Sequence, residues 1–324
     1  MDRPDVRRLA PNLWQLRRYQ RAWFRYDVLA GLTVAAYLVP QVMAYAELAG
    51  LPAVVGLWAM IGPLVVYAVL GSSRQLSVGP ESTTALMTAA AIGPLAAGDP
   101  ERYAGLAAAL CLVVGALCLL GWAGRLGFVA DLLSKPVLVG YMAGIALIMV
   151  GSQLGTLAGV DVEGDSFAEE VAHFAGQLDQ IHGPTLALAL AVLAMLLVGS
   201  HLRPRWPMPL VGMLLAAAVV AVFDLETFGI AVIGEIPAGL PTPSLPEVSS
   251  PDLESLLLPA IGLAIVAYSD NVLTGRTFAA RNDYNIDNNQ EFLALGASNL
   301  AAGVMQGFPV SSSGSRTVIG DSVG

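Results

Sequence analysis

The stretch GFPVSSSGSRT, residues 307–317, places four serines and one arginine among segments that are apolar enough to lie in lipid. Serines before a helix act as N-caps, because their oxygens accept hydrogen bonds from the first free backbone amides. Those amides and the helix dipole also attract anions, and the planar arginine guanidinium suits an oxyanion. The stretch therefore predicts half of an anion site at membrane depth, with the substrate-binding residues Ser313, Gly314, Ser315 and Arg316.

The composition around this stretch is that of a membrane protein. Of the 324 residues, 56% are hydrophobic and 13% are charged, whereas about 25% of the residues of a soluble domain are charged. Apolar runs of about 20 residues, long enough to cross a bilayer, recur along the chain. We predict an all-α, multi-pass membrane protein with about ten spans, at residues 27–46, 52–70, 77–97, 103–123, 136–158, 184–201, 207–223, 255–275, 289–306 and from 311 onward.

The positive charges predict how these spans are oriented. Residues 1–26 carry seven arginines among aromatic residues, and we interpret this amphipathic segment as lying on the cytoplasmic face of the inner membrane rather than as binding nucleic acid. If the chain crosses at every span, the predicted external loops 159–182 and 224–254 contain no lysine or arginine. Residues 125–135 are too few and too charged to span, and we expect an interfacial helix there.

A second interrupted helix is predicted at residues 76–84, LSVGPESTT, where an extended stretch ends at Gly-Pro before small polar residues. Proline is tolerated in the first helical turn, and broken helices at membrane depth occur where they line a cavity. The substrate-binding residues expected from this half-helix are Glu81, Ser82 and Thr83. We consider Glu81 either a second ionisable site or a carboxylate stabilised by the helix dipole, and we favour the dipole.

Two interrupted helices at corresponding positions are typical of transporters that are built from inverted repeats. If the third and tenth spans correspond, the repeat unit contains seven spans. The first repeat then covers residues 27–223, an acidic external loop follows at 224–254, and a partial second repeat occupies 255–324. A complete second repeat needs four further spans, so we expect the 324 residues to be part of a longer protein.

Ionisable and polar groups inside the spans are further candidates. Asp270 lies in the eighth span, where a carboxylate costs at least about 2.5 kcal/mol on insertion scales, and Thr274 shares its helix face. The two form either a packing pair or a coupling site for sodium or a proton, and we expect Asp270 to pair with Arg316. On the first span, Gln41 and Tyr45 present polar groups on one face, for interhelical hydrogen bonds or for substrate.

Three stretches resemble the SulP family of anion permeases. The first runs with gaps from GLTV at residue 31, through PQVMAYA at residue 40, to GSSRQLSVGP at residues 71–80; the second is NQEFLALGASN at residues 289–299. The third combines FPV at residue 308 with SRT at residue 315. The resemblance implies seven-plus-seven spans in inverted repeats, a core domain that moves against a gate domain, and a homodimer in the full-length form. Many members also carry a cytoplasmic STAS domain.

The resemblance also implies roles for individual residues. It places an anion between the third and tenth half-helices, with the positions of Gln41, Tyr45, Ser315 and Arg316 in contact with it. Proton-coupled sulfate members carry a glutamate where this chain has Asp270, whereas a sodium-using bicarbonate member carries Asp-x-x-x-Thr there, as this chain does. Sodium and proton therefore both remain open as the coupling ion.

We predict secondary active transport of small inorganic anions by alternating access, with sulfate ahead of bicarbonate and dicarboxylates. The alternatives are a sodium-coupled bicarbonate or dicarboxylate transporter, an uncoupled anion channel, a non-transporting membrane scaffold, and a nucleobase transporter of the same fold. The sequence offers no nucleophile with a base, no phosphate loop and no cluster of metal ligands. We therefore expect neither an enzyme nor a resident cofactor, and no partner beyond the anion, the bilayer and a second copy.

Overall fold

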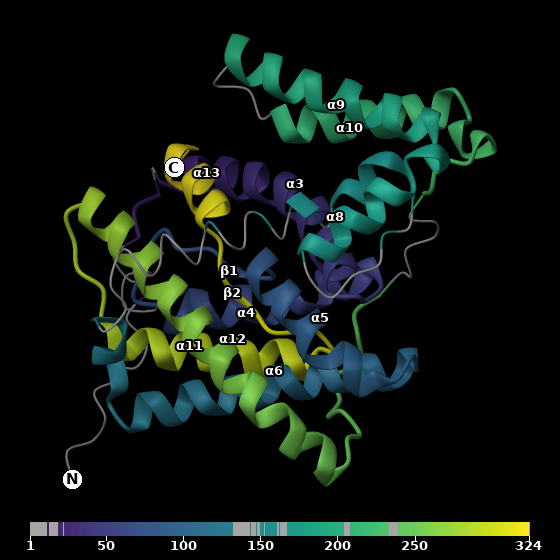
Figure 1. Ribbon diagram of the computed structural model, residues 1–324. Coiled ribbons are helices and arrows are strands. Elements are labelled where there is room, and N and C mark those ends of the chain that lie inside the picture. Colours follow the sequence, from purple (N-terminus) through teal and green to yellow (C-terminus); the bar gives the residue numbers. More distant parts are fainter. Residues whose placement is uncertain are drawn as a thin grey trace, which may run out of the picture. The chain divides into compact units, whose positions relative to one another are not determined.

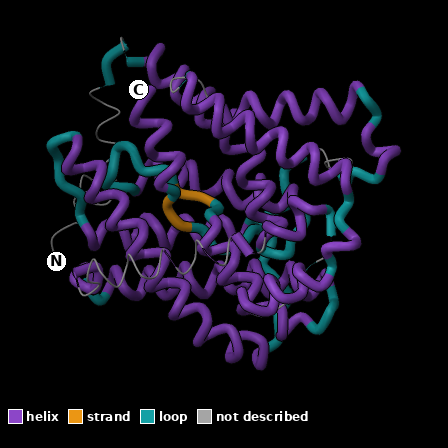
Figure 2. The backbone as a smooth tube through the Cα atoms, turned by 45° about the horizontal axis from the view of Figure 1, so that its top comes forward, coloured by secondary structure: helices purple, strands orange, loops and turns teal. Residues whose placement is uncertain are grey.

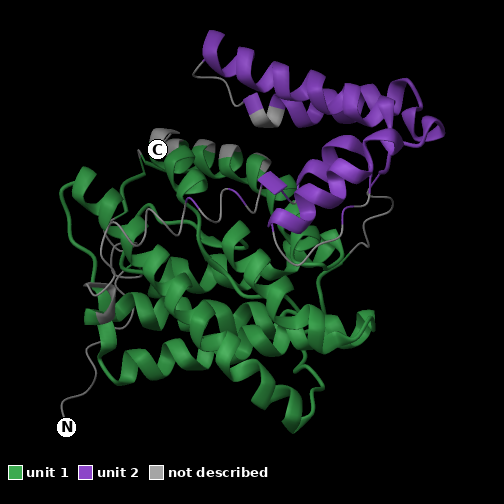
Figure 3. Cartoon of the chain, viewed as in Figure 1, with its two compact units in different colours: residues 1–133, 236–324 green, residues 134–235 purple. Residues whose placement is uncertain are grey.

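The computed structural model describes residues 19–21, 23–131, 153–160, 167–203, 208–232 and 239–323, together with a few single residues outside these ranges. The described chain is mainly helical (Figure 1). It divides into two compact units, of which unit 1 comprises Met1–Leu133 and Ile236–Gly324 and unit 2 comprises Ser134–Glu235 (Figure 3). The units are groups of helices that pack together, whereas each predicted repeat is one continuous part of the sequence. The units therefore do not test the repeat boundaries, which remain a prediction.

Unit 1 contains the three longest helices and the only strands among the described residues. Its elements are α3 (Phe24–Leu48), α4 (Ala53–Leu70), β1 (Val78–Gly79), α5 (Ser82–Ala96), α6 (Pro100–Ala123), the 3-10 helix η1 (Leu126–Asp131), α11 (Ser250–Arg281), α12 (Asn288–Val304), β2 (Ser311–Ser312) and α13 (Gly314–Val323). Unit 2 contains α8 (Phe167–Gly176), η2 (Leu178–Gln180), α9 (Gly183–Leu202), α10 (Met208–Val222) and η3 (Leu225–Phe228).

The predicted spans coincide with these helices, except for 136–158, most of which lies outside the described residues. In the part of the chain that the structure describes, four helices are long and apolar enough to cross a membrane: Ala53–Leu70, Pro100–Ala123, Gly183–Leu202 and Ser250–Arg281. Large apolar side chains remain exposed on them, such as Leu120 at 68% and Leu258 at 79%. Such exposure suits a lipid environment, and the chain is a multi-pass membrane protein.

Acidic and hydroxyl residues fix where several helices begin. Ser249 caps α11 in a capping box with Asp252, so that this helix starts five residues before its predicted span. Asp99 caps α6 by accepting hydrogen bonds from the amides of the first turn, and Asp287 does the same for α12. Two helical elements lie within the predicted external loop 224–254: η3 near its beginning and the first residues of α11 at its end. Of the predicted interfacial helix at 125–135, the structure describes the 3-10 turn η1.

The two predicted extended stretches pair with each other, which the sequence did not indicate. β1 and β2 run antiparallel, with Val78 opposite Ser312 and Gly79 opposite Ser311. Figure 2 shows this small pair of strands surrounded by helices. The Ser313 amide continues the pairing by donating to the Ser77 carbonyl at 2.9 Å. Each stretch thus satisfies backbone groups of the other at a depth where lipid could not.

Small residues allow the helices of unit 1 to approach closely. Gly115 on α6 faces Gly296 on α12, and a Cβ atom at either position would lie 2.9 Å from the other's carbonyl oxygen. A Cβ at Gly303 would lie 2.8 Å from the Leu112 side chain. Packing of this kind holds membrane helices together where the hydrophobic effect cannot.

Candidate anion site

Glu81 caps the N-terminus of α5 with its side chain. Its carboxylate accepts hydrogen bonds from the Thr83 amide at 3.0 Å, the Thr84 amide at 3.3 Å and the Ser82 hydroxyl at 2.9 Å. This geometry agrees with the interpretation of Glu81 as a carboxylate at the positive end of a helix dipole. The Thr83 and Thr84 amides in the first turn of α5 therefore already donate to a carboxylate.

Ser313 caps the N-terminus of α13. Its hydroxyl oxygen accepts from the Arg316 amide at 3.5 Å and lies 3.2 Å from the Ser315 hydroxyl. The expectation that all four serines serve as caps is wrong, because Ser311 donates to the Ala267 carbonyl on α11 and Ser312 donates to Asp270. Ser311 and Ser312 belong to β2, where their side chains reach α11 instead of the helix that follows. Gly314 and Ser315 are exposed at the start of α13.

Arg316 is fully buried in the first turn of α13. Its Nη1 donates to the Pro80 carbonyl at 2.7 Å and to the Gln41 side-chain oxygen at 3.2 Å, and its Nε donates to the Ser77 hydroxyl at 3.3 Å. The predicted ion pair with Asp270 is wrong, since all three acceptors are neutral. Nη2 is buried and has no hydrogen-bond partner among the described residues. A buried cation with an unused donor is suited to hold an anion.

Gln41 connects α3 to this arginine. While its oxygen accepts from Arg316, its Nε2 donates to the Tyr45 hydroxyl at 3.0 Å and to the Tyr37 hydroxyl at 3.2 Å. Tyr45 also lies close to Ser82 at the start of α5. Tyr37 is absent from the sequence prediction, although the spacing of residues 37, 41 and 45 places all three on one helix face.

Asp270 approaches the same strands from α11. One carboxylate oxygen accepts from the Ser312 hydroxyl at 3.0 Å, and Glu81 lies within range of electrostatic interaction. Thr274 lies one turn further along α11 and is half-buried. The structure therefore brings Asp270 close to the two half-helix starts through β2, without contact to the buried arginine.

A fully buried carboxylate, absent from the sequence prediction, supports these elements from α12. Glu291 is fully buried and accepts hydrogen bonds from Tyr67 on α4, from the amide and hydroxyl of Ser72, and from Asn271 on α11, at 2.6 to 2.9 Å. Because Asn271 follows Asp270 directly, this network fixes the part of α11 that faces the site. A carboxylate in an apolar helix was the available signal, as it was for Asp270.

Asn299, also on α12, holds the extended stretch that leads into β2. Its side-chain oxygen accepts from the Val310 amide at 3.0 Å, and its side-chain nitrogen donates to the Val310 carbonyl at 3.1 Å. One buried amide side chain thus satisfies both backbone groups of a residue that precedes the half-helix. The anion-site residues all belong to unit 1.

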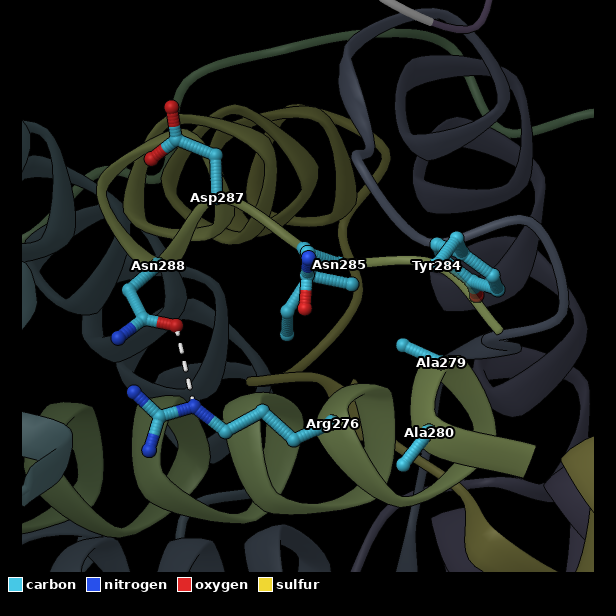
Figure 4. A pocket seen from close by; sticks show the side chains of 8 residues that line it. Arg276, Ala279, Ala280, Tyr284, Asn285, Asp287 and Asn288 are labelled. Carbon is cyan, nitrogen blue, oxygen red and sulfur yellow. Dashed lines mark hydrogen bonds between the residues drawn. The ribbon is translucent and has the colours of Figure 1, made fainter. Parts of the chain in front are cut away.

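A separate hollow of about 750 Å³ lies at the turn between α11 and α12. Figure 4 shows Arg276 reaching toward Asn288, whose side-chain oxygen accepts from the arginine Nε at 3.3 Å. Tyr284 and Asn285 line the same hollow. It is distinct from the half-helix starts, since none of the predicted site residues lines it.

The fold and the half-helix starts can be compared with known proteins. Residues 24–324 match the Sulfate permease family. The chain belongs to this family. A protein of Mycobacterium tuberculosis named "Probable sulfate transporter" is 59% identical over 97% of this chain and 56% of its own length. Sulfate transporter 4.1, chloroplastic, of Arabidopsis thaliana is 34% identical over 96% of this chain and 46% of its own length. The chain thus spans about half the length of these relatives.

Solved structures share the fold. The murine Solute Carrier 26 family member A9 anion transporter, in the inward-facing state, aligns with a TM-score of 0.90 and 27% identity, covering 98% of this chain and 56% of that one. The transmembrane domain of the cyanobacterium bicarbonate transporter BicA aligns with a TM-score of 0.84 and 23% identity, covering 94% of this chain and 79% of that one. The described helices thus belong to the inverted-repeat transporter fold, and the family consists of transporters rather than enzymes.

Proposed function

We propose that the protein is a secondary transporter of small inorganic anions, with sulfate as the first substrate. One observation carries the proposal: the buried Arg316 lies between the starts of two half-helices, is held by neutral acceptors and keeps one donor without a partner among the described residues. An anion between these helix starts gains the dipole of α13 and a charge-assisted hydrogen bond from Arg316. The names of the sulfate transporters among the relatives support sulfate over bicarbonate.

The binding residues in this proposal are those that the sequence predicted. They are Gln41, Tyr45, Glu81, Ser82, Thr83, Ser313, Gly314, Ser315 and Arg316. Unit 1 would form the core that carries the anion, and unit 2 would contribute to the gate, with alternating access produced by relative movement of core and gate. The full-length form would be a homodimer of the inner membrane, with a cytoplasmic N-terminus.

The test is uptake of radiolabelled sulfate by the full-length protein in liposomes. We expect Arg316→Ala to reduce uptake at least about tenfold, because the anion loses its charged partner. Arg102→Ala is the matched control, since that arginine is exposed and pairs with Asp252. Equal uptake by the wild-type protein and Arg316→Ala would sink the assignment of the site, and linear, non-saturating flux would indicate a channel.

A sodium-coupled bicarbonate transporter is the second candidate, favoured by the Asp270 carboxylate and by Thr274 one turn further along α11. Their oxygens are ligands of the kind that hard cations take, and Asp270 could equally carry a proton. Sodium and proton gradients imposed separately on the liposomes distinguish the two. A sodium requirement that disappears in Asp270→Asn would support sodium coupling, whereas uptake driven by a proton gradient alone would contradict it.

A further inference from the structure

Glu81 differs from the other carboxylates that cap helices in the described part of unit 1. Asp99 and Asp287 also accept hydrogen bonds from two first-turn amides, but both side chains are exposed. Glu81 is partly buried, it adds the Ser82 hydroxyl to its donors, and its helix begins at the anion site. Glutamate is also not among the preferred N-cap residues, unlike aspartate. The helix start alone therefore does not account for this side chain.

The donors that Glu81 occupies are those that an incoming oxyanion would use on the α5 side. A carboxylate is itself an oxyanion, and it accepts from the Thr83 and Thr84 amides as a bound sulfate or bicarbonate would. On the α13 side, by contrast, the buried Arg316 Nη2 lacks a partner among the described residues. Donors on the α5 side are thus occupied by the protein itself, whereas one buried donor on the α13 side is not, among the described residues.

Arg316 and Glu81, one from each side of the site, lie close to each other. Arg316 donates to the carbonyl of Pro80, the residue directly before Glu81, at 2.7 Å. A Cβ atom at Gly79 would lie 3.5 Å from Nη2, so this nitrogen lies close to the backbone that leads into the cap. Glu81 and Arg316 interact electrostatically but are not within the 4.0 Å that defines an ion pair. An anion that binds Nη2 would therefore lie within electrostatic range of the Glu81 carboxylate.

We propose that Glu81 is a built-in competitor of the transported anion. Its carboxylate occupies the α5 donors in the empty site and leaves them when the anion binds, and its negative charge limits the affinity of the site. This inference rests on the proposed function. The consequence is a site that releases its anion readily, because the protein supplies a replacement acceptor for the same amides. Glu81 is then a residue that sets affinity and turnover rather than one that attracts the substrate.

The experiment measures sulfate binding to the full-length protein by isothermal titration calorimetry in detergent, together with uptake in liposomes. Glu81→Gln removes the charge and keeps an acceptor oxygen of the same length. We expect the Kd for sulfate to fall by about tenfold or more, since like charges at this range repel strongly at the low dielectric of a buried site. KM should fall as well, while the maximal rate should also fall because release slows.

Two further variants separate competition from a structural role. Glu81→Asp keeps the charge and is the better N-cap, so we expect its Kd to equal or exceed that of the wild-type protein. Asp99→Asn removes a capping charge from an exposed helix start, so its Kd should not change. A Kd for Glu81→Gln that is unchanged or higher, while the wild-type protein binds sulfate, would overturn the proposal.

Other outcomes also decide the matter. If Glu81→Gln does not fold, Glu81→Asp with a lower Kd than the wild-type protein would overturn the proposal, and an equal or higher one would support it. Sulfate binding that is absent from the wild-type protein and from every variant would contradict the proposed function itself, and the competitor proposal would be rejected with it.

Discussion

α5 and α13 each follow a two-residue strand, and the two strands pair, yet the helices begin with different caps. α5 begins with the carboxylate of Glu81, whereas α13 begins with the hydroxyl of Ser313. A hydroxyl satisfies one amide and leaves the positive end of the dipole open to an anion, while a carboxylate fills it. Two half-helices of similar backbone plan thus contribute opposite electrostatics to one site.

The connections that lead into the two half-helices are both held from α12, but by different chemistry. Glu291 binds Ser72 before β1, and Asn299 binds Val310 before β2. The carboxylate accepts from four donors, whereas the amide exchanges two hydrogen bonds with one residue. Breaking each support in turn shows how far each half-helix start depends on it.

The largest effect is expected for Glu291→Gln. The new amide group would present donors to the Ser72 amide and hydroxyl, which are themselves donors, inside a fully buried network. A hydrogen bond to a charged group is worth about 1.5–3 kcal/mol, and both bonds from Ser72 are lost, so we expect the thermal midpoint in detergent to fall. Asp287→Asn, exposed at the start of the same helix, is the control. Unfolding of Glu291→Gln at the wild-type midpoint would show that the network contributes no stability.

A smaller effect is expected for Asn299→Ala. The substitution removes two neutral hydrogen bonds from the amide and carbonyl of Val310, each worth about 0.5–1.5 kcal/mol. The loss concerns the α13 side alone, so sulfate affinity should fall together with the midpoint. Asn285→Ala at the α11–α12 turn is the control, since that side chain is exposed. Affinity that is retained while the midpoint falls would show that α13 keeps its position without this clamp.

The sequence predicted the elements of this site better than their contacts. Spans and helix starts follow from local chemistry, as at residues 76–84 and 307–317, because apolar length and capping residues act within one turn. The pairing of β1 with β2 joins segments more than 230 residues apart along the chain, and two-residue strands carry no pattern that identifies a partner. That pairing could not be predicted.

The error concerning Asp270 has a similar cause. The prediction paired two opposite charges because each was the other's evident partner in the sequence. In the fold, Arg316 donates to the Pro80 carbonyl and to the Gln41 side-chain oxygen, and Asp270 accepts from Ser312. Neutral acceptors and hydroxyl donors of these kinds occur many times in any sequence. Acceptors of this kind are chosen by geometry rather than by residue type. Tyr37, in contrast, was predictable from its spacing to Gln41.

Ser313→Ala tests whether the hydroxyl cap of α13 affects sulfate affinity less than the carboxylate cap of α5. Loss of an N-cap hydroxyl costs about 1 kcal/mol, so we expect a modest decrease in the thermal midpoint. Because the lost group is neutral, the Kd for sulfate should change by less than about threefold, whereas removal of the Glu81 charge should change it more. Calorimetry on the two variants side by side provides the measurement. A change as large as that of Glu81→Gln would mean that occupancy of the amides matters and charge does not.

The smallest effect is expected for a charged pair outside the site, Arg102 and Asp252, whose nitrogen and oxygen lie 2.8 Å apart with 45% and 16% of their side chains exposed. The Ser249 hydroxyl and then the Arg102 guanidinium lower the pKa of Asp252 below its usual 3.8, and this residue precedes the predicted span at 255–275. A carboxylate with a lowered pKa stabilises the fold above its usual pKa and loses that contribution as the pH falls through the lowered one.

Arg102→Ala should therefore lower the thermal midpoint by less than about 2 °C at neutral pH, with the difference vanishing in acid. Midpoints of both proteins across a pH series provide the measurement, and a larger loss would mean that charges outside the site contribute to stability as its buried groups do. Arg102 would then no longer serve as the control for Arg316.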